Sequence, residues 1–247
     1  MWFALAICAV TAPALDAQVA TPKGAARGAT VRDASRPALD GSMQRIVALT
    51  NVFRRLENLS ATERNPQLAK AARYFADFMA RTDQYSHSAD GSEPAERAKK
   101  FGYDYCIVAE NIAYMFNSQG FGTAELADRF FDGWQNSPEH RRNMLEPNVT
   151  DTAVAIAQSA KTGRFYAVQL FGRPKSASIE FKVQNSAGVD VEYALDGKTF
   201  ALPPRVTRTH RGCTPFELAF RGRAVQPTNG QTLTVVNDRD GVQLKAQ

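Results

Sequence analysis

Residues Trp134–Leu145 read Trp-Gln-Asn-Ser-Pro-Glu-His-Arg-Arg-Asn-Met-Leu, and the rest of the chain is interpreted around them. Ser137 followed by Pro138 is typical of a helix start, because the serine oxygen can accept from free first-turn amides and proline has no amide to leave unpaired. Glu139 and His140 then fall in the opening turn. The positive end of the helix dipole favours the neutral form of His140, which can accept a hydrogen bond or bind a metal.

Two other short runs place polar side chains where they could join this helix. Tyr85–Ser88 follows a long amphipathic segment, and Ala109–Ala113 places Glu110 inside an otherwise apolar run. The chain has only 3 histidines, and His87 and His140 lie in these runs. The three segments are therefore candidates for one polar site.

Four motifs in order resemble a known family. They are Ser-His at 86–87, Glu-Asn-Ile-Ala at 110–113, the 134–145 stretch and Tyr-Ala-Val-Gln-Leu-Phe-Gly at 166–172. Together they resemble the CAP superfamily, also called the SCP or pathogenesis-related-1 domain, in its bacterial form. The resemblance implies an α+β fold over residues 42–173, built as a three-layer α-β-α sandwich.

Apolar spacing and capping residues predict the elements of this region. We expect helices at 42–58, from 66 to about 79, at 94–101 and at 123–134, an extended segment at 103–115, and a hairpin of strands at 152–158 and 164–171. Asn65 and Thr123 are the expected caps of the second and fourth helices. Phe130, Phe131 and Trp134 are expected in the core.

The ends of the chain differ from this region. Residues 1–17 are typical of a cleaved signal peptide, with an apolar run followed by small residues. Residues 18–41 predict a flexible tail or linker. Short alternating runs over 176–247 predict a small all-β, sandwich-like module that the resemblance does not cover, in which His210 is expected to be exposed.

Composition limits the partners. A net charge of +5 and a pI near 9.2 could favour an anionic polymer, but residues 43–173 carry 16 basic and 15 acidic side chains. No basic stripe with interleaved aromatics is present, which argues against nucleic acid. Removal of the signal peptide would leave Cys106 and Cys213, which either form one disulfide in an exported protein or remain two buried thiols.

The resemblance also suggests site residues. CAP domains have a cavity tetrad of two histidines and two glutamates, which in some members holds a divalent cation. His87 matches the first histidine and Glu110 the first glutamate, but Asn136 and Ser137 stand where the second glutamate would be. His140 is expected to line the same cleft. The expected cleft residues are His87, Glu110, Asn111, Ser137, His140 and Arg141.

Some of these residues have plain structural alternatives. Asn111 could hold backbone turns, Ser137 is first a helix cap, and Arg141 could simply pair with Glu139 or Glu146.

Three classes of function remain open. The preferred one is an exported, periplasmic or extracellular binding module without catalysis, for a lipid, glycan or protein of the cell envelope. The second is a hydrolase in which His87 and His140 hold zinc or another divalent cation and Glu110 is the general base. The third is a scaffold protein that acts through the β module. The resemblance itself implies no particular activity.

Overall fold

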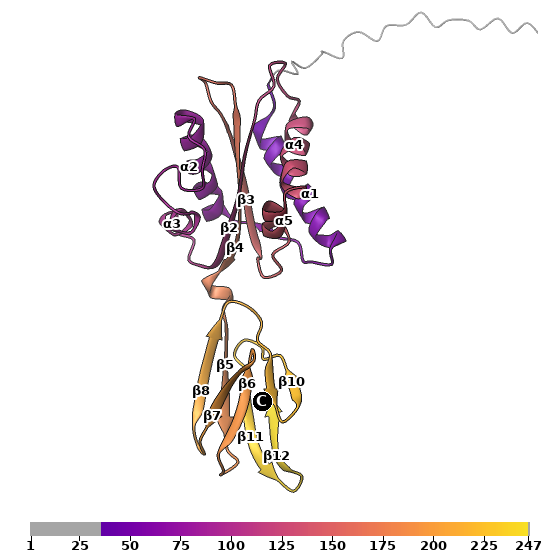
Figure 1. Ribbon diagram of the computed structural model, residues 1–247, viewed down its shortest axis with the longest axis vertical. Helices are drawn as coiled ribbons and strands as arrows, with labels where there is room; N and C mark the ends of the chain where they lie inside the picture. The colour runs from indigo at the N-terminus through magenta and orange to yellow at the C-terminus, as the bar shows by residue number, and fades with distance from the viewer. Residues whose placement is uncertain (1–35, 247) are drawn as a thin grey trace, which may run out of the picture. The chain divides into compact units, whose positions relative to one another are not determined.

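The computed structural model describes residues 36–246 (Figure 1). The expected signal peptide, 1–17, and residues 18–35 of the expected tail lie outside the described residues. The N-terminal domain is built on one four-stranded sheet with the strand order β1-β3-β4-β2. Its strands are β1 (Glu63–Arg64), β2 (Tyr105–Met115), β3 (Asp151–Gln158) and β4 (Phe165–Pro174).

Helices cover both faces of this sheet, so the expected three layers are present (Figure 1). Alternate residues of β3 serve two separate cores, because successive side chains of a strand point to opposite faces. Val154 and Ile156 pack with one set of helices, whereas Ala153 and Ala155 pack with the other. The first set is α1 (Leu39–Leu56), α4 (Thr123–Gln135) and α5 (Pro138–Met144), and the second is α2 (Pro66–Thr82) and α3 (Pro94–Lys100).

The predicted start of α2 is confirmed, and two other predicted starts need correction. Asn65 caps α2, since its side chain accepts from the amides of Gln67 and Leu68. Thr123 does not cap α4, because Gly122 occupies the cap position. The Thr123 hydroxyl instead accepts from the amide of Ala38 at 2.9 Å. This contact anchors the start of α1, which begins at residue 39 rather than 42, so the end of the expected tail is helical.

The predicted aromatic core is also confirmed. Phe130, Phe131 and Trp134 are all buried, at 0%, 8% and 1% exposure. Gly172, the last residue of the fourth motif, allows a close approach, because a Cβ there would lie 2.5 Å from the Tyr103 hydroxyl. No helix within residues 36–246 is both long and apolar enough to cross a bilayer.

The C-terminal part consists of two four-stranded sheets that share one apolar core. Their strand orders are β10-β9-β6-β7 and β12-β11-β5-β8, and β5 and β11 run parallel. A short 3-10 helix, η1 (Lys175–Ala177), precedes them. The strands are β5 (Ile179–Asn185), β6 (Val191–Leu195), β7 (Lys198–Leu202), β8 (Thr207–Gly212), β9 (Leu218–Phe220), β10 (Arg223–Val225), β11 (Thr232–Asp238) and β12 (Gly241–Ala246).

Candidate functional site

The candidate site lies at the outer edge of β2, a strand that pairs only with β4 within the described residues. An edge strand normally leaves carbonyl and amide groups unpaired. Here the Ile112 carbonyl accepts from Trp134 Nε1 at 3.2 Å and from the Tyr85 hydroxyl at 3.1 Å. The Glu110 carbonyl accepts from Asn143 Nδ2 at 3.1 Å. These side chains close the strand edge and hold the segment around residue 85, α4 and α5 against it.

The Glu110 carboxylate is buried in an ion pair. Arg97 Nη2 of α3 donates to both of its oxygens, at 3.0 and 2.8 Å, and both side chains are 1% exposed. Arg97 also bonds Asp90 Oδ1 at 2.9 Å and the His87 carbonyl at 2.8 Å. Its guanidinium carbon lies 3.6 Å from the centre of the Phe75 ring. Glu110 is therefore held by an internal cation rather than left free in a cleft.

His87 is the exposed partner of this pair. Its Nδ1 lies 2.9 Å from Glu110 Oε1, while its side chain is 49% exposed. A carboxylate can only accept, so Nδ1 carries the proton. Nε2 has no hydrogen-bond partner among residues 36–246, so it is the free nitrogen of this ring.

His140 contributes the second imidazole. Its Nδ1 lies 2.9 Å from Ser137 Oγ. Ser137 occupies the cap position of α5, but its side chain bonds no first-turn amide. The cap prediction for the Ser137 hydroxyl is wrong, because that hydroxyl bonds the imidazole instead. The pKa of His140 is lowered, first by burial and then by the nearby His87, while Glu139 opposes the change. The direction agrees with the prediction, but the causes are burial and His87 rather than the helix dipole.

Asn111 ties β2 to α5. It is completely buried, and its Nδ2 donates to the His140 carbonyl at 3.1 Å. Its Oδ1 accepts from Asn143 Nδ2 at 2.9 Å. Asn111 therefore positions His140 rather than facing a ligand.

Arg141 makes its side-chain contacts with Phe53 of α1 and with Glu57, the residue after that helix. It pairs with Glu57 at 2.7 Å, rather than with Glu139 or Glu146, and its guanidinium carbon lies 4.6 Å from the centre of the Phe53 ring. The structure thus brings together His87, Glu110, Asn111, Ser137 and His140, and places Arg141 with α1.

The donor set does not fit a resident divalent cation. Zinc sites use three or four protein ligands, and catalytic sites use at least three. Both oxygens of Glu110 are bonded by Arg97, which leaves two imidazole nitrogens. Within residues 36–246, no three His, Cys, Asp or Glu side chains are grouped to hold a metal.

Two further sequence expectations concern the C-terminal part. Cys106 of β2 and Cys213, which follows β8, form a disulfide across 107 positions of sequence. His210 is not the exposed residue that was expected. It is partly buried, with its ring 5.2 Å from that of Phe181, and its Nε2 bonds the Tyr193 hydroxyl. Alternation along β8 turns it toward these aromatic side chains.

Arg97 is the site residue that the sequence did not reveal. It lies in the run Pro94–Lys100, whose composition is typical of an exposed helix. One weak indication was present, since a carboxylate in an apolar segment requires a cation or several hydrogen-bond donors. Nothing in the spacing specified which cation would supply it.

The α-β-α layers and the polar edge of β2 together define the class of domain. A family model described as the cysteine-rich secretory protein family, CAP, matches residues 47–171. The match spans half of the chain, and the chain belongs to this family. The resemblance inferred from the four motifs is confirmed.

Known proteins share this domain over part of their length. "Uncharacterized protein YkwD" of Bacillus subtilis is 30% identical over 131 residues, which are 53% of this chain and 47% of that protein. The chain thus spans about half the length of this curated relative. An extracellular SCP-domain protein from Bacillus anthracis is 27% identical, with a TM-score of 0.46 over 54% of this chain and 41% of that one. An outer surface protein from Borrelia burgdorferi is 20% identical, with a TM-score of 0.48 over 54% of this chain and 93% of that one.

Proposed function

We propose that the protein is an exported binding module whose CAP domain captures a cell-envelope ligand without chemical conversion. The ligand would contact the imidazole site, defined as His87, Ser137 and His140 with Glu110 behind them. One observation carries this proposal: Arg97 holds both oxygens of Glu110. The carboxylate is used to fix His87 rather than to activate water.

The geometry argues against a hydrolase in which Glu110 is the general base. A general base must reach the proton that it removes, within about 2.6–3.2 Å or through one water. Glu110 is 1% exposed and bonded to a guanidinium, so a water molecule has no open approach to it. A hydrolase with Glu110 as its base would first have to break this ion pair.

The exposed groups indicate which part of a ligand the site would hold. With Nδ1 of His87 and Nδ1 of His140 already bonded, each ring has one further nitrogen for a ligand, and the Ser137 hydroxyl can both donate and accept. His87 and His140, with Ser137 beside the latter, therefore suit hydroxyl and amide groups better than acyl chains. Glycans and peptides of the envelope offer such groups at high density.

Export is part of the proposal. The Cys106–Cys213 disulfide supports an oxidising compartment, because disulfides are rare in the cytosol. The apolar start of the chain followed by small residues supports a signal peptide. We therefore place the protein in the periplasm or outside the cell.

The test is a co-sedimentation assay with purified cell-wall sacculi and, separately, with lipid vesicles of the same cells. His87→Ala should weaken binding to sacculi about tenfold, the equivalent of one lost hydrogen bond in a partly buried site. Arg142→Ala is the matched control, because Arg142 is exposed on α5, in the same helix as His140. Unchanged binding by His87→Ala, or turnover of wall material that is lost in His87→Ala, would contradict the proposal.

A further inference from the structure

An exposed phenyl ring follows the end of β2. Of the Phe, Tyr and Trp residues in 36–246, Phe116 is the most exposed, at 60%. A Cβ on Gly163 would lie 3.3 Å from Phe116 Cε2, so Gly163 packs closely beside the ring. The ring is thus supported by the β3–β4 turn while most of the residue faces solvent. Such a ring offers a flat apolar surface for stacking.

Polar side chains lie around this ring. Phe116 lines a pocket of about 550 Å³ together with the loop that follows it and with Gln158 and Gly163. Asn117 Oδ1 accepts from the Gln119 amide at 3.0 Å, and Gln158 Nε2 donates to the Gly163 carbonyl at 3.2 Å. Within the described part of the chain, Asn117 Nδ2 remains as a donor and Gln158 Oε1 as an acceptor. This pocket, which we call the Phe116 pocket, therefore combines an apolar ring with groups that can bond a hydroxyl.

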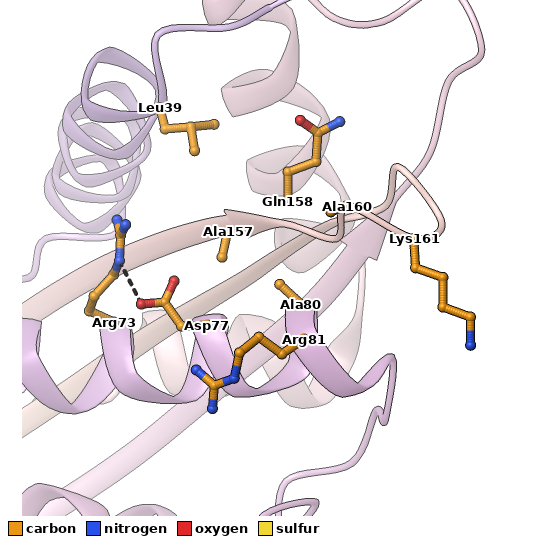
Figure 2. Close-up of a pocket in the computed structure, with 9 residues that line it drawn as sticks. All are labelled: Leu39, Arg73, Asp77, Ala80, Arg81, Ala157, Gln158, Ala160 and Lys161. Carbon is orange, nitrogen blue, oxygen red and sulfur yellow. Dashed lines mark hydrogen bonds and ion pairs between the residues drawn. The ribbon is translucent and has the colours of Figure 1, made fainter.

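A second pocket adjoins the first at Gln158, which lines both of them (Figure 2). Its volume is about 720 Å³, and its lining comes from α2, the start of α1 and the end of β3 with the turn after it. Arg73 and Asp77 of α2 pair with each other at 3.0 Å, so their charges balance. Arg81 and Lys161 also line this pocket and form no ion pair with any residue that the structure describes. We call it the cationic pocket.

The acidic residue that follows α2 does not cancel both of these charges. Asp83 Oδ1 accepts from Thr162 Oγ1 at 2.7 Å and from the Tyr166 hydroxyl at 3.1 Å. The carboxylate is therefore bonded by two hydroxyl groups, and its single negative charge stands against the two positive charges of Arg81 and Lys161. The cationic pocket keeps an excess of positive charge that favours an anionic ligand.

We propose that the two adjoining pockets bind an acidic polysaccharide, with a sugar ring stacked on Phe116 and carboxylate groups at Arg81 and Lys161. A pyranose ring presents C–H groups on its faces, and the negative face of an aromatic ring attracts them. The sugar hydroxyls match the free donor of Asn117 and the free acceptor of Gln158. A lipid bilayer would leave these amides without partners, which costs free energy.

The polysaccharide site goes beyond the imidazole site and is separate from it. Six positions lie between Glu110 and Phe116 along the extended chain of β2, a length of about 20 Å at about 3.3 Å per residue. A ligand at one site need not touch the other, so binding at the two sites can be measured independently.

The probe is tetragalacturonate, a tetramer of an acidic pyranose, titrated calorimetrically into the full chain at low salt. Its methyl ester keeps the sugar rings and removes the charges. Acetylated and amidated tetraglutamate keeps the carboxylates and removes the rings. We expect tetragalacturonate to bind with a Kd of about 1 mM or tighter, and each comparison compound to bind at least about tenfold more weakly.

One pair of variants tests the stacking surface. Phe116→Ala should weaken the binding of tetragalacturonate about fivefold, because it removes the aromatic face. Leu56→Ala is the matched control, since Leu56 is 77% exposed on α1 and lines neither pocket. It should bind the probe as the wild type does.

A second pair of variants tests the cations. Arg81→Glu with Lys161→Glu should weaken binding at least about tenfold, because both attractions become repulsions. Arg55→Glu with Lys182→Glu changes the net charge equally at exposed positions outside both pockets and should leave binding nearly unchanged.

Four results would overturn the polysaccharide site. The first is no binding of tetragalacturonate at about 1 mM. The second is equal affinity for tetraglutamate, which would show an anion or peptide site that does not use the ring. The third is unchanged binding by Phe116→Ala, and the fourth is equal loss in the two charge-reversed variants. None of these experiments changes His87 or His140, whose variants test the imidazole site.

Discussion

His87 and His210 show how differently two imidazoles can be used in one chain. His87 is half exposed and bonds a buried carboxylate through one nitrogen, which leaves the other nitrogen free. His210 is packed among aromatic rings, with the ring centres of Phe181 and Phe200 both 5.2 Å away. Its Nε2 bonds the Tyr193 hydroxyl. The first arrangement leaves a nitrogen available for binding, whereas the second uses the ring as part of a core.

The residues behind each imidazole explain the difference. The internal ion pair of Arg97 and Glu110 orients His87 from within. In the β module, burial lowers the pKa of His210, and the nearby Arg208 lowers it further. A buried ion pair therefore fixes the orientation of His87, whereas the surroundings of His210 favour the neutral form of its ring.

The largest loss of stability is expected from removing the positive charge of Arg97, which pairs with the carboxylate that orients His87. Arg97→Met would leave the buried carboxylates of Glu110 and Asp90 without their shared cation, and removing one partner of a buried pair costs about 3–5 kcal/mol. Urea unfolding followed by circular dichroism measures this loss. Arg97→Met combined with Glu110→Leu should recover the part of the loss that comes from Glu110, with Asp90 still unpaired from Arg97, whereas equal instability of the single and double variants would show that the Arg97–Glu110 pair is not the cause.

The next largest loss of stability is expected from removing the disulfide between Cys106 of β2 and Cys213 of the β module. Replacing Cys106 and Cys213 by serine should lower the free energy of unfolding by about 2–4 kcal/mol, because the unfolded chain gains freedom. Thermal unfolding with and without reductant measures it. The wild type in reductant should match the serine variant, and a reductant effect in the serine variant itself would contradict this explanation.

A smaller difference in stability is expected between the alanine variants of the two histidines. His210→Ala should destabilise the protein by about 1–2 kcal/mol, because it removes an aromatic contact and a hydrogen bond from a partly buried position. His87→Ala should cost only about 0.5 kcal/mol, since an exposed pairing contributes little. Equal losses in the two variants would remove the distinction between a binding and a structural histidine.

The smallest effect is a pH dependence from His210. Its pKa is lower in the folded chain than in the unfolded chain, so protons bind the unfolded chain more readily. Its contribution to stability is complete above pH about 6.5 and is lost as the pH falls toward the folded pKa. Chemical unfolding between pH 7 and 5 should therefore show a weaker decline in His210→Phe than in the wild type, about 1 kcal/mol or less.

Sequence patterns predicted the parts of the molecule that depend on local chemistry. The cap at Asn65, the core aromatics around Trp134 and the hairpin around Gly163 depend on spacing and turn residues, which neighbouring positions reveal. The pairing of Glu110 with Arg97 depends on tertiary packing of α3 against β2, and no local pattern contains it. Ser137 shows the same limit, because an imidazole three residues away competed for the hydroxyl that a first-turn amide was expected to use.

The central claim is that Glu110 is committed to Arg97, so that the imidazole site binds a ligand without a resident metal. The most direct measurement is the zinc content of the purified protein, by elemental analysis after incubation with zinc and dialysis, beside His87→Ala combined with His140→Ala. We predict well below one zinc per chain in both proteins, because two imidazoles alone do not complete a zinc site. About one zinc per wild-type chain, lost in the double variant, would contradict the claim and favour the hydrolase.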